Sequence, residues 1–236
     1  MSKLILLRHG QSQWNLENRF TGWVDVDLTA EGEAQAQRGG ELIKETGVDL
    51  ALAYTSVLTR AIRTASMALS KADQAFVPLI KDWRLNERHY GGLTGLDKAE
   101  TAARHGADQV HIWRRSYDIP PPNLAPGGEY DFSKDRRYAG VTLPQTESLK
   151  TTLERVLPYW ESEIAPHLKA GENILIAAHG NSLRAIVKHL FSVPDDKIVG
   201  VEIPTGNPLL IDLDPNLKPT AARYLDAARA TPLPGL

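Results

Sequence analysis

The sequence predicts an α/β fold, a three-layer α/β/α sandwich around a mostly parallel sheet. Short apolar runs of a length that suits buried strands alternate with longer segments whose apolar residues recur at helical spacing. A chain with this alternation buries its strands between two layers of helices. The runs that predict strands are 4–7, 48–54, 76–80, 174–178 and, as a last strand at the sheet edge, 209–213.

Length and composition favour a single domain over residues 1–236. The chain has 236 residues, a formal net charge of −2 and no cysteine. Its size suits one core with an insertion. The balanced charge argues against nucleic-acid or membrane partners, and the lack of cysteine excludes disulfides and thiolate chemistry. No apolar run has the length of a membrane span, and Arg8 comes too early for a signal peptide, so we expect a cytoplasmic protein.

Capping residues place the first long helix. Thr29 is suited to cap a helix that runs to about Thr46, because Glu31 and Glu33 lie in its first turn and Gly47 follows its end. Helical spacing predicts three more helices, at 58–69, at 147–168 with a break or kink near Pro158, and at 183–190.

The alternation of strands and helices breaks down over residues 91–143. Apart from an expected helix at 98–105, this insertion is rich in the proline and glycine of irregular loops. Long loops on compact domains often act as lids, so we expect the insertion to cover a site. The C-terminal tail, 215–236, is predicted to hold a short helix at 221–229 and to be mobile at 231–236.

Two apolar runs end in the same dipeptide. Arg8-His9-Gly10 follows the first run, and His179-Gly180-Asn181 follows the run 174–178. A single His-Gly usually indicates only a turn. Ligands of open α/β sheets bind outside the carboxyl ends of the strands, so two parallel strands ending this way would direct two imidazoles into one crevice.

The remaining chemistry-bearing residues suit a phosphoryl group. The sequence lacks a dinucleotide fingerprint, a P-loop, a zinc-protease motif and a serine nucleophile elbow. Its candidates are instead two histidines, four arginines (Arg8, Arg60, Arg114 and Arg115) and the carboxylate of Glu87. Guanidinium groups match phosphate oxygens, an imidazole can carry a phosphate covalently, and a carboxyl group can protonate a leaving alkoxide.

These motifs resemble those of the histidine phosphatase superfamily and, within it, of the cofactor-dependent phosphoglycerate mutases. Arg8-His9-Gly10 with Ser12, Trp14 and Asn15 resembles the superfamily signature. The stretches that resemble the mutases more specifically are 87–91, 98–101, 113–117, 146–150, 177–184 and 203–206. The resemblance extends from residue 3 to about residue 225. It implies interconversion of 2-phosphoglycerate and 3-phosphoglycerate in glycolysis and gluconeogenesis, with 2,3-bisphosphoglycerate as priming phosphate donor and no metal.

The resemblance also implies a role for each matching residue. His9 becomes the phosphohistidine, Glu87 gives and takes the substrate proton, and His179 stabilises the transition state. Arg8 and Arg60 hold the transferring phosphate. The full set implied to bind substrate is Arg8, His9, Gly10, Gln11, Ser12, Gln13, Trp14, Asn15, Thr21, Gly22, Arg60, Glu87, Arg88, His89, Tyr90, Lys98, Arg114, Arg115, Gly180 and Asn181.

Two other functions stay open at this stage. A broad-specificity phosphatase of the same superfamily would use His9 but pass the phosphate to water. A non-catalytic phosphate-binding relative would need neither His9 nor Glu87, although both are present. For His89, a structural role between its neighbours is at least as well supported as substrate binding. The resemblance implies a homodimer or homotetramer, and phosphoglycerates as the small-molecule partners.

Overall fold

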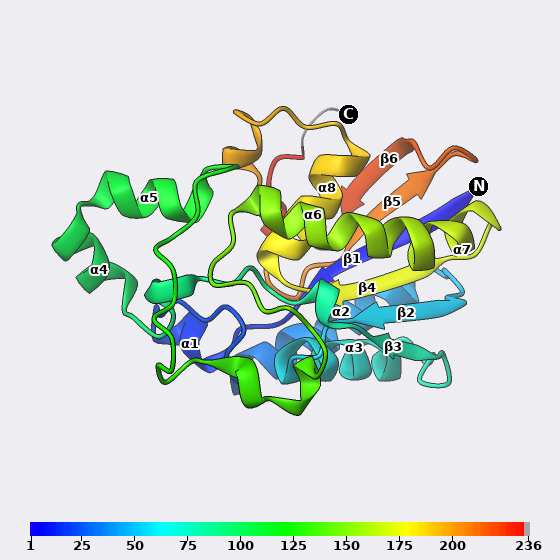
Figure 1. Ribbon diagram of the computed structural model, residues 1–236. Coiled ribbons are helices and arrows are strands. Elements are labelled where there is room, and N and C mark those ends of the chain that lie inside the picture. Colours follow the sequence, from blue (N-terminus) through cyan, green and yellow to red (C-terminus); the bar gives the residue numbers. More distant parts are fainter. Residues whose placement is uncertain (234–236) are drawn as a thin grey trace.

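The computed structural model describes residues 1–233 and has the three layers that the sequence predicts (Figure 1). Its six-stranded sheet has the order β3-β2-β4-β1-β5-β6. Neighbouring strands from β3 to β1 are parallel, β5 is antiparallel to β1, and β6 is antiparallel to β5. The strands are β1 (Ser2–Arg8), β2 (Leu52–Thr55), β3 (Leu79–Lys81), β4 (Ile174–Ala178), β5 (Leu209–Leu213) and β6 (Pro219–Tyr224).

Strand β1 shows why both faces of the sheet need a helical layer. Its side chains alternate between the faces, as they must in an extended strand. Leu4 and Leu6 belong to one hydrophobic cluster, and Ile5 and Leu7 belong to the other. All four are fully buried, so a strand with an unbroken apolar run needs a cover on each side.

The two layers come from different parts of the chain. Helices α2 (Ala30–Glu45) and α3 (Thr59–Lys71) pack on the face of Ile5. Helices α6 (Leu149–Tyr159), α7 (Ala165–Lys169) and α8 (Gly180–Leu190) pack on the face of Leu4 (Figure 1). The predicted cap of α2 is confirmed, because the hydroxyl oxygen of Thr29 accepts a hydrogen bond from the backbone N–H of Gly32 at 3.1 Å.

The predicted break near Pro158 is also confirmed. Pro158 lies in the last turn of α6, and residues 160–164 then form a π-helical turn before α7 begins. Proline has no backbone N–H, so the regular ladder of hydrogen bonds is interrupted at this position. A wider turn is one way in which a helix accommodates such an interruption while continuing in nearly the same direction.

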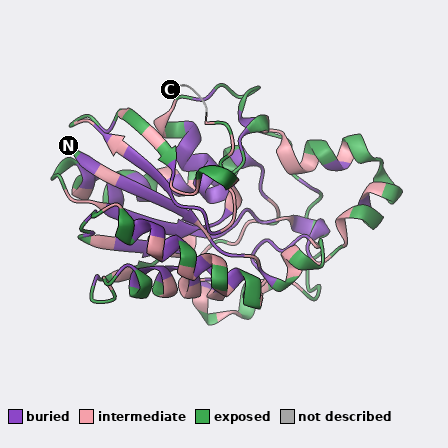
Figure 2. Cartoon of the chain, turned by 180° about the vertical axis from the view of Figure 1, so that it is seen from behind, coloured by how far each residue is buried: buried purple, intermediate pink, exposed green. Residues whose placement is uncertain are grey.

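The insertion forms an arm that extends beyond the carboxyl ends of the parallel strands (Figure 1). It contains the expected helix α4 (Lys98–His105) and, where irregular loop was expected, a second helix, α5 (Ala107–Arg115). Gly106, at φ +88°, ends the first helix and allows the second to begin. Much of the arm is exposed, in contrast to the buried strands (Figure 2).

Short helical turns account for most of the remaining regular structure. A four-residue helix, α1 (Gln13–Leu16), follows the first His-Gly and is capped by Ser12. The 3₁₀ turns lie at 83–85, 91–93, 132–134, 136–138, 198–200 and 227–229. None of the helices within residues 1–233 has the length and apolar content to cross a membrane.

Two predictions about the C-terminal part are wrong. The helix expected at 221–229 is instead the strand β6 followed by a 3₁₀ turn, and β5 is therefore not the edge strand. A turn at Asp214 explains this result, because its carboxylate accepts hydrogen bonds from the N–H groups of Asn216 and Lys218. The chain reverses there, and ladder bonding to β5 outweighs the helix propensity of the alanines.

Strand limits also differ from those predicted. The strand expected at 76–80 forms at Leu79–Lys81, and the run at 48–54 contributes β2 only from Leu52. Of the tail residues expected to be mobile, 234–236 lie outside the described residues.

Candidate active site

The pairing of β1 with β4 brings the two His-Gly turns together. Arg8 and Ala178 are register partners at the ends of these parallel strands, so the next residue of each chain segment is a histidine. The backbone N–H of His9 donates to the carbonyl of Ala178 at 2.9 Å. The imidazole centroids of His9 and His179 lie 5.0 Å apart, and both residues are buried. The predicted meeting of two imidazoles is therefore present.

The hydrogen bonding of His9 leaves one ring nitrogen available. Its Nδ1 lies 2.7 Å from the carbonyl oxygen of Gly10. A carbonyl can only accept, so Nδ1 carries the hydrogen and Nε2 keeps its lone pair when the ring is neutral. Burial, together with the positive charges of Arg60 and Arg8, holds the pKa of His9 well below the ordinary value of 6.5. His9 is thus a neutral imidazole with a free nucleophilic nitrogen.

Gly10 allows the backbone to pass very close to α2. A Cβ at this position would lie 2.0 Å from the carbonyl oxygen of Gly32, which is closer than any side chain could tolerate. Both positions therefore need glycine, and the close approach fixes the loop after His9 against the start of α2.

His179 has the opposite arrangement of ring nitrogens. Its Nε2 lies 2.7 Å from the hydroxyl oxygen of Ser56, which itself accepts a hydrogen bond from the N–H of Leu58. If Ser56 donates to Nε2, its hydroxyl hydrogen is satisfied and Nδ1 carries the ring hydrogen. That Nδ1 is buried and has no hydrogen-bond partner in residues 1–233. His179 is therefore suited to donate a hydrogen bond to an anion beside His9.

Two arginines, Arg60 buried and Arg8 half-buried, supply positive charge around the imidazoles. Arg60 donates to the carbonyls of Val24 and Gly22, each at 2.8 Å, and Arg8 donates to that of Ile203 at 2.9 Å. Neither arginine makes an ion pair within the described residues, and the Nε of each is buried without a partner there. Burial lowers the pKa of Arg60 to about 10, so its guanidinium remains charged at neutral pH. Such a pocket favours an anion with several oxygens.

Glu87 enters the same pocket from the segment after β3. Its Oε1 accepts hydrogen bonds from the N–H of Asn181 at 3.0 Å and from the N–H of Arg88 at 2.8 Å. Asn181 lies in the first turn of α8, where free N–H groups and the helix dipole favour a carboxylate. The carboxylate is held at the edge of the histidine pair, where it can exchange a proton with a substrate oxygen.

The pocket lining includes five residues that the sequence did not predict. Of those predicted, the lining includes Arg8, His9, Asn15, Thr21, Gly22, Arg60, Glu87, Tyr90, Lys98, Arg114, Arg115, Gly180 and Asn181. The residues that sequence reasoning missed are Arg19, Phe20, Arg184, Glu202 and Ile203. Most of these lie next to or inside stretches that resemble the mutases. The sequence therefore indicated these parts of the chain but assigned the residues no role.

Other predicted binding residues lie outside the lining and support it. Gln11, Ser12 and Gln13 build the turn after His9, while Trp14 packs under the guanidinium of Arg19 at 3.9 Å. His89 is buried against Trp23 at a ring separation of 5.6 Å. Burial lowers the pKa of His89 to about 4, so it stays neutral. This placement favours the structural alternative for His89.

The insertion contributes cations to the far side of the pocket. Arg114 and Arg115 lie in the last turn of α5, and Lys98 lies at the start of α4. Burial lowers the pKa of Lys98. Arg115 forms an ion pair with Glu202, so a ligand that uses this guanidinium must compete with a carboxylate.

No group of three histidine, cysteine, aspartate or glutamate side chains within residues 1–233 lies close enough together to hold a metal ion.

The chain belongs to the histidine phosphatase superfamily. The sequence profile of its branch 1 matches residues 4–218. The fold agrees: the structure of a Bacillus stearothermophilus protein, YhfR, is similar with a TM-score of 0.70 at 25% identity, covering 93% of this chain and 94% of that one. A mycobacterial glucosyl-3-phosphoglycerate phosphatase has a TM-score of 0.70 at 23% identity, covering 95% and 97%, and shows the likeness of fold alone.

Curated relatives are much more similar in sequence. A 2,3-bisphosphoglycerate-dependent phosphoglycerate mutase of Caulobacter sp. (strain K31) is 80% identical over all 236 residues of both chains. A protein of the same name from Hyphomonas neptunium is 66% identical over the whole of both chains. Another, from Zymomonas mobilis, is 60% identical over 96% of this chain and 99% of its own.

The charge and tautomer of the two imidazoles can be measured directly. In two-bond proton–nitrogen NMR spectra at about pH 6, where an ordinary histidine is mostly charged, His9 and His179 should both be neutral. Each should carry its hydrogen on Nδ1. Because the folded pKa lies below 6.5, the unfolded chain takes up protons first, so stability should fall as the pH drops below that value. A ring that titrates near 6.5, or a hydrogen on His179 Nε2, would contradict this assignment.

Proposed function

We propose that the protein interconverts 2-phosphoglycerate and 3-phosphoglycerate by way of a phosphate carried on His9. The observation that carries the proposal is the neutral, hydrogen-bonded His9 beside His179, among arginines without carboxylate partners in the described chain. The mutase names of relatives up to 80% identical over the full chain support the same reaction. Glu87 completes the set, because phosphate exchange with a hydroxyl group needs a proton acceptor and donor.

His9 and Glu87 divide the chemistry between them. When His9 gives up its phosphate, the N–P bond breaks, a substrate hydroxyl oxygen bonds to phosphorus, and the Glu87 carboxylate takes the hydroxyl proton. In the second half, His9 Nε2 attacks the other phosphate, and the broken P–O bond leaves its electrons on oxygen. Glu87 returns the proton to that oxygen, so both residues recover their starting forms.

The other residues of the pocket hold charge. Arg8 and Arg60 surround the phosphate in transfer, and His179 donates from Nδ1 to its oxygens as negative charge shifts. We propose that Lys98, Arg114 and Arg115, which line the pocket, hold the distal anionic group of the substrate. Arg88 lies behind the lining, and its buried Nε and Nη1 without a partner in the described chain support the same role. These cations replace the divalent ion that many phosphoryl-transfer sites use, so we propose that no metal is needed.

The pocket also fits a bisphosphate. Buried N–H groups of Arg8, Arg60 and Arg88 lack partners in the described chain, as expected of a site built for a highly charged anion. When bound, 2,3-bisphosphoglycerate supplies the first phosphate to His9. A cytoplasmic location and a homodimeric or homotetrameric state remain predictions.

Mapping the phosphate tests the proposal. After exposure to 2,3-bisphosphoglycerate, mass spectrometry under alkaline conditions should find one acid-labile phosphate, on His9. His9→Ala should abolish both the label and the activity. His167→Ala is the matched control, because His167 is half-exposed on α7, outside the pocket lining, and pairs with Glu172. A label on another residue, or a His9→Ala variant with full activity, would refute the assignment.

A second test separates a mutase from a phosphatase. A phosphatase needs to hold only the phosphate in transfer, whereas a mutase must also retain the distal group while the intermediate reorients. Loss of one charge-assisted contact costs roughly 1.5–3 kcal/mol, or about a ten- to hundredfold weakening. Arg114→Ala or Arg115→Ala should therefore raise KM for phosphoglycerate and raise the ratio of inorganic phosphate released to substrate isomerised.

The control for this test is Arg104→Ala. Arg104 belongs to the same arm but is exposed, and it forms an ion pair with Glu100 on its own helix. It should leave KM and the ratio unchanged. If the Arg114 and Arg115 variants also leave the ratio unchanged, the arm does not retain the intermediate, and the phosphatase alternative gains support.

A further inference from the structure

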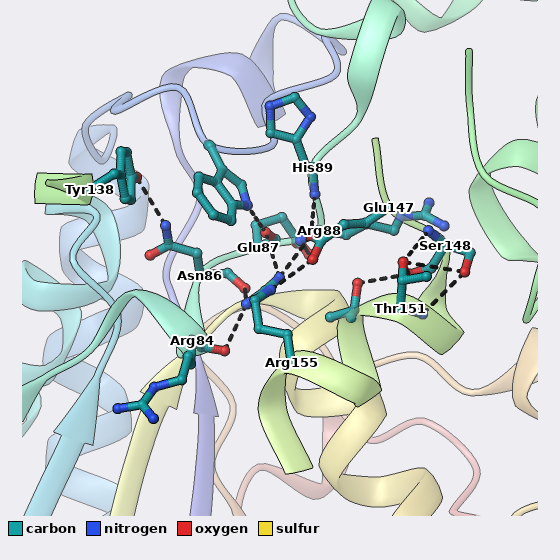
Figure 3. Close-up of polar contacts among 12 residues, drawn as sticks. Arg84, Asn86, Glu87, Arg88, His89, Tyr138, Glu147, Ser148, Thr151 and Arg155 are labelled. Carbon is teal, nitrogen blue, oxygen red and sulfur yellow. Dashed lines mark hydrogen bonds and ion pairs between the residues drawn. The ribbon is translucent and has the colours of Figure 1, made fainter. Parts of the chain in front are cut away.

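We propose that Arg155, held by Glu147, is a positioning residue that places Glu87 for proton transfer. The inference rests on the role proposed for Glu87. Neither Arg155 nor Glu147 lines the pocket. Their ion pair is almost fully buried, with side-chain exposures of 7% and 3%, between α6 and the segment that carries Glu87 (Figure 3).

Arg155 donates hydrogen bonds to three backbone carbonyl groups of the segment 84–87, which ends at Glu87. Its Nη1 donates to the carbonyl of Arg84 at 2.7 Å and to that of Asn86 at 3.3 Å, and its Nη2 donates to that of Glu87 at 3.3 Å (Figure 3). The ring N–H of Trp23 gives the Glu87 carbonyl a second, shorter bond of 2.6 Å. Asn86 and Glu87 follow the 3₁₀ turn at 83–85 and belong to no strand, so their carbonyls need side-chain donors.

Glu147 fixes both the arginine and the other end of the same segment. Its two carboxylate oxygens receive Nε and Nη2 of Arg155 at 2.7 and 2.8 Å, a bidentate pair. One of these oxygens also accepts the N–H of His89 at 2.8 Å, and the backbone N–H of Glu147 donates to the His89 carbonyl at 2.9 Å. The pair therefore holds the backbone on both sides of Arg88, directly after Glu87.

These contacts decide where the Glu87 carboxylate can lie. That carboxylate bonds to the start of α8, whereas its backbone is bonded to α6 through Arg155. The distance between the proton-transferring oxygen and the histidines thus depends on a fixed backbone position. Buried ion pairs often add little net stability compared with apolar residues of similar size. A pair whose bonds converge on one catalytic segment is better explained by positioning.

Leaving-group dependence distinguishes positioning from general stability. Phosphate transfer from bisphosphoglycerate to His9 requires protonation of the alkoxide that leaves, whereas the 2,4-dinitrophenolate released from 2,4-dinitrophenyl phosphate leaves without a proton. Arg155→Lys keeps the charge but loses the planar fork. It should slow His9 phosphorylation by bisphosphoglycerate about 10- to 100-fold, since small displacements of a catalytic group cost this much. It should slow transfer from the dinitrophenyl ester less than about threefold, because that leaving group does not need a proton from Glu87.

Three further variants complete the design. Glu87→Gln should show the same selective loss, more strongly. Val156→Ala is the matched control, because Val156 is the next residue of α6, is buried in the core, and has an apolar side chain that cannot hydrogen-bond to the segment. It should lower the unfolding temperature yet affect both donors equally. If Arg155→Lys does not fold, Trp23→Phe removes one bond to the Glu87 carbonyl and should give a smaller selective loss.

Each outcome bears on a separate claim. A selective loss in Glu87→Gln but an equal loss for both donors, or none, in Arg155→Lys and Trp23→Phe would overturn the positioning role alone. If Glu87→Gln shows no selectivity, the proposed function is wrong at Glu87, and the positioning role falls with it. The inference is supported if Glu87→Gln, Arg155→Lys and Trp23→Phe all show the selective loss and Val156→Ala shows none.

Discussion

The parallel pairing of β1 with β4 is the constraint on which the rest of the site depends. It aligns Arg8 with Ala178, so each strand places its histidine at the same edge of the sheet. A shift of one residue in this register would turn the buried side chains of a strand to the opposite face and separate the imidazoles. The core on both faces therefore enforces the geometry of the active site. Helix α8 then begins directly after the second histidine, so backbone N–H groups of its first turn lie beside the pocket.

The active site holds several positively charged side chains and few carboxylates to balance them. Arg8 and Arg60 satisfy their guanidinium groups with carbonyl oxygens instead of ion pairs, and two imidazoles beside them stay neutral. Burying charge in this way is costly without a ligand, so the protein sacrifices stability to prepare a place for a phosphoryl group. Of two ion pairs near the site, Arg155 with Glu147 lies outside the pocket lining, whereas Arg115 with Glu202 belongs to the lining.

The local sequence pattern was sufficient to predict the features of the fold that depend on neighbouring residues in the chain. The apolar runs predicted the central strands, Thr29 predicted the start of α2, and Pro158 predicted a break in α6. The strand β6 was missed because its alanines favour a helix, and only pairing with β5 decides otherwise.

Those site residues that belong to a recognisable sequence motif could be predicted. Both His-Gly turns and Glu87 belong to such stretches, and the structure brings them together. Ser56 and Arg155 were missed because their importance lies in long-range contacts, from Ser56 to His179 and from Arg155 to the segment of Glu87. Residues far apart in the chain give no local signal of such contacts.

If His9 carries the phosphate and the protein retains the bisphosphate, isomerisation must depend on priming and release little inorganic phosphate. Phosphorus NMR of 3-phosphoglycerate, with and without a catalytic amount of 2,3-bisphosphoglycerate, measures this directly on protein first freed of phosphate. We expect 2-phosphoglycerate to appear at a rate set by the bisphosphate concentration, while inorganic phosphate stays a small fraction of the product. Isomerisation that needs no priming, or inorganic phosphate released as fast as substrate is isomerised, would contradict it.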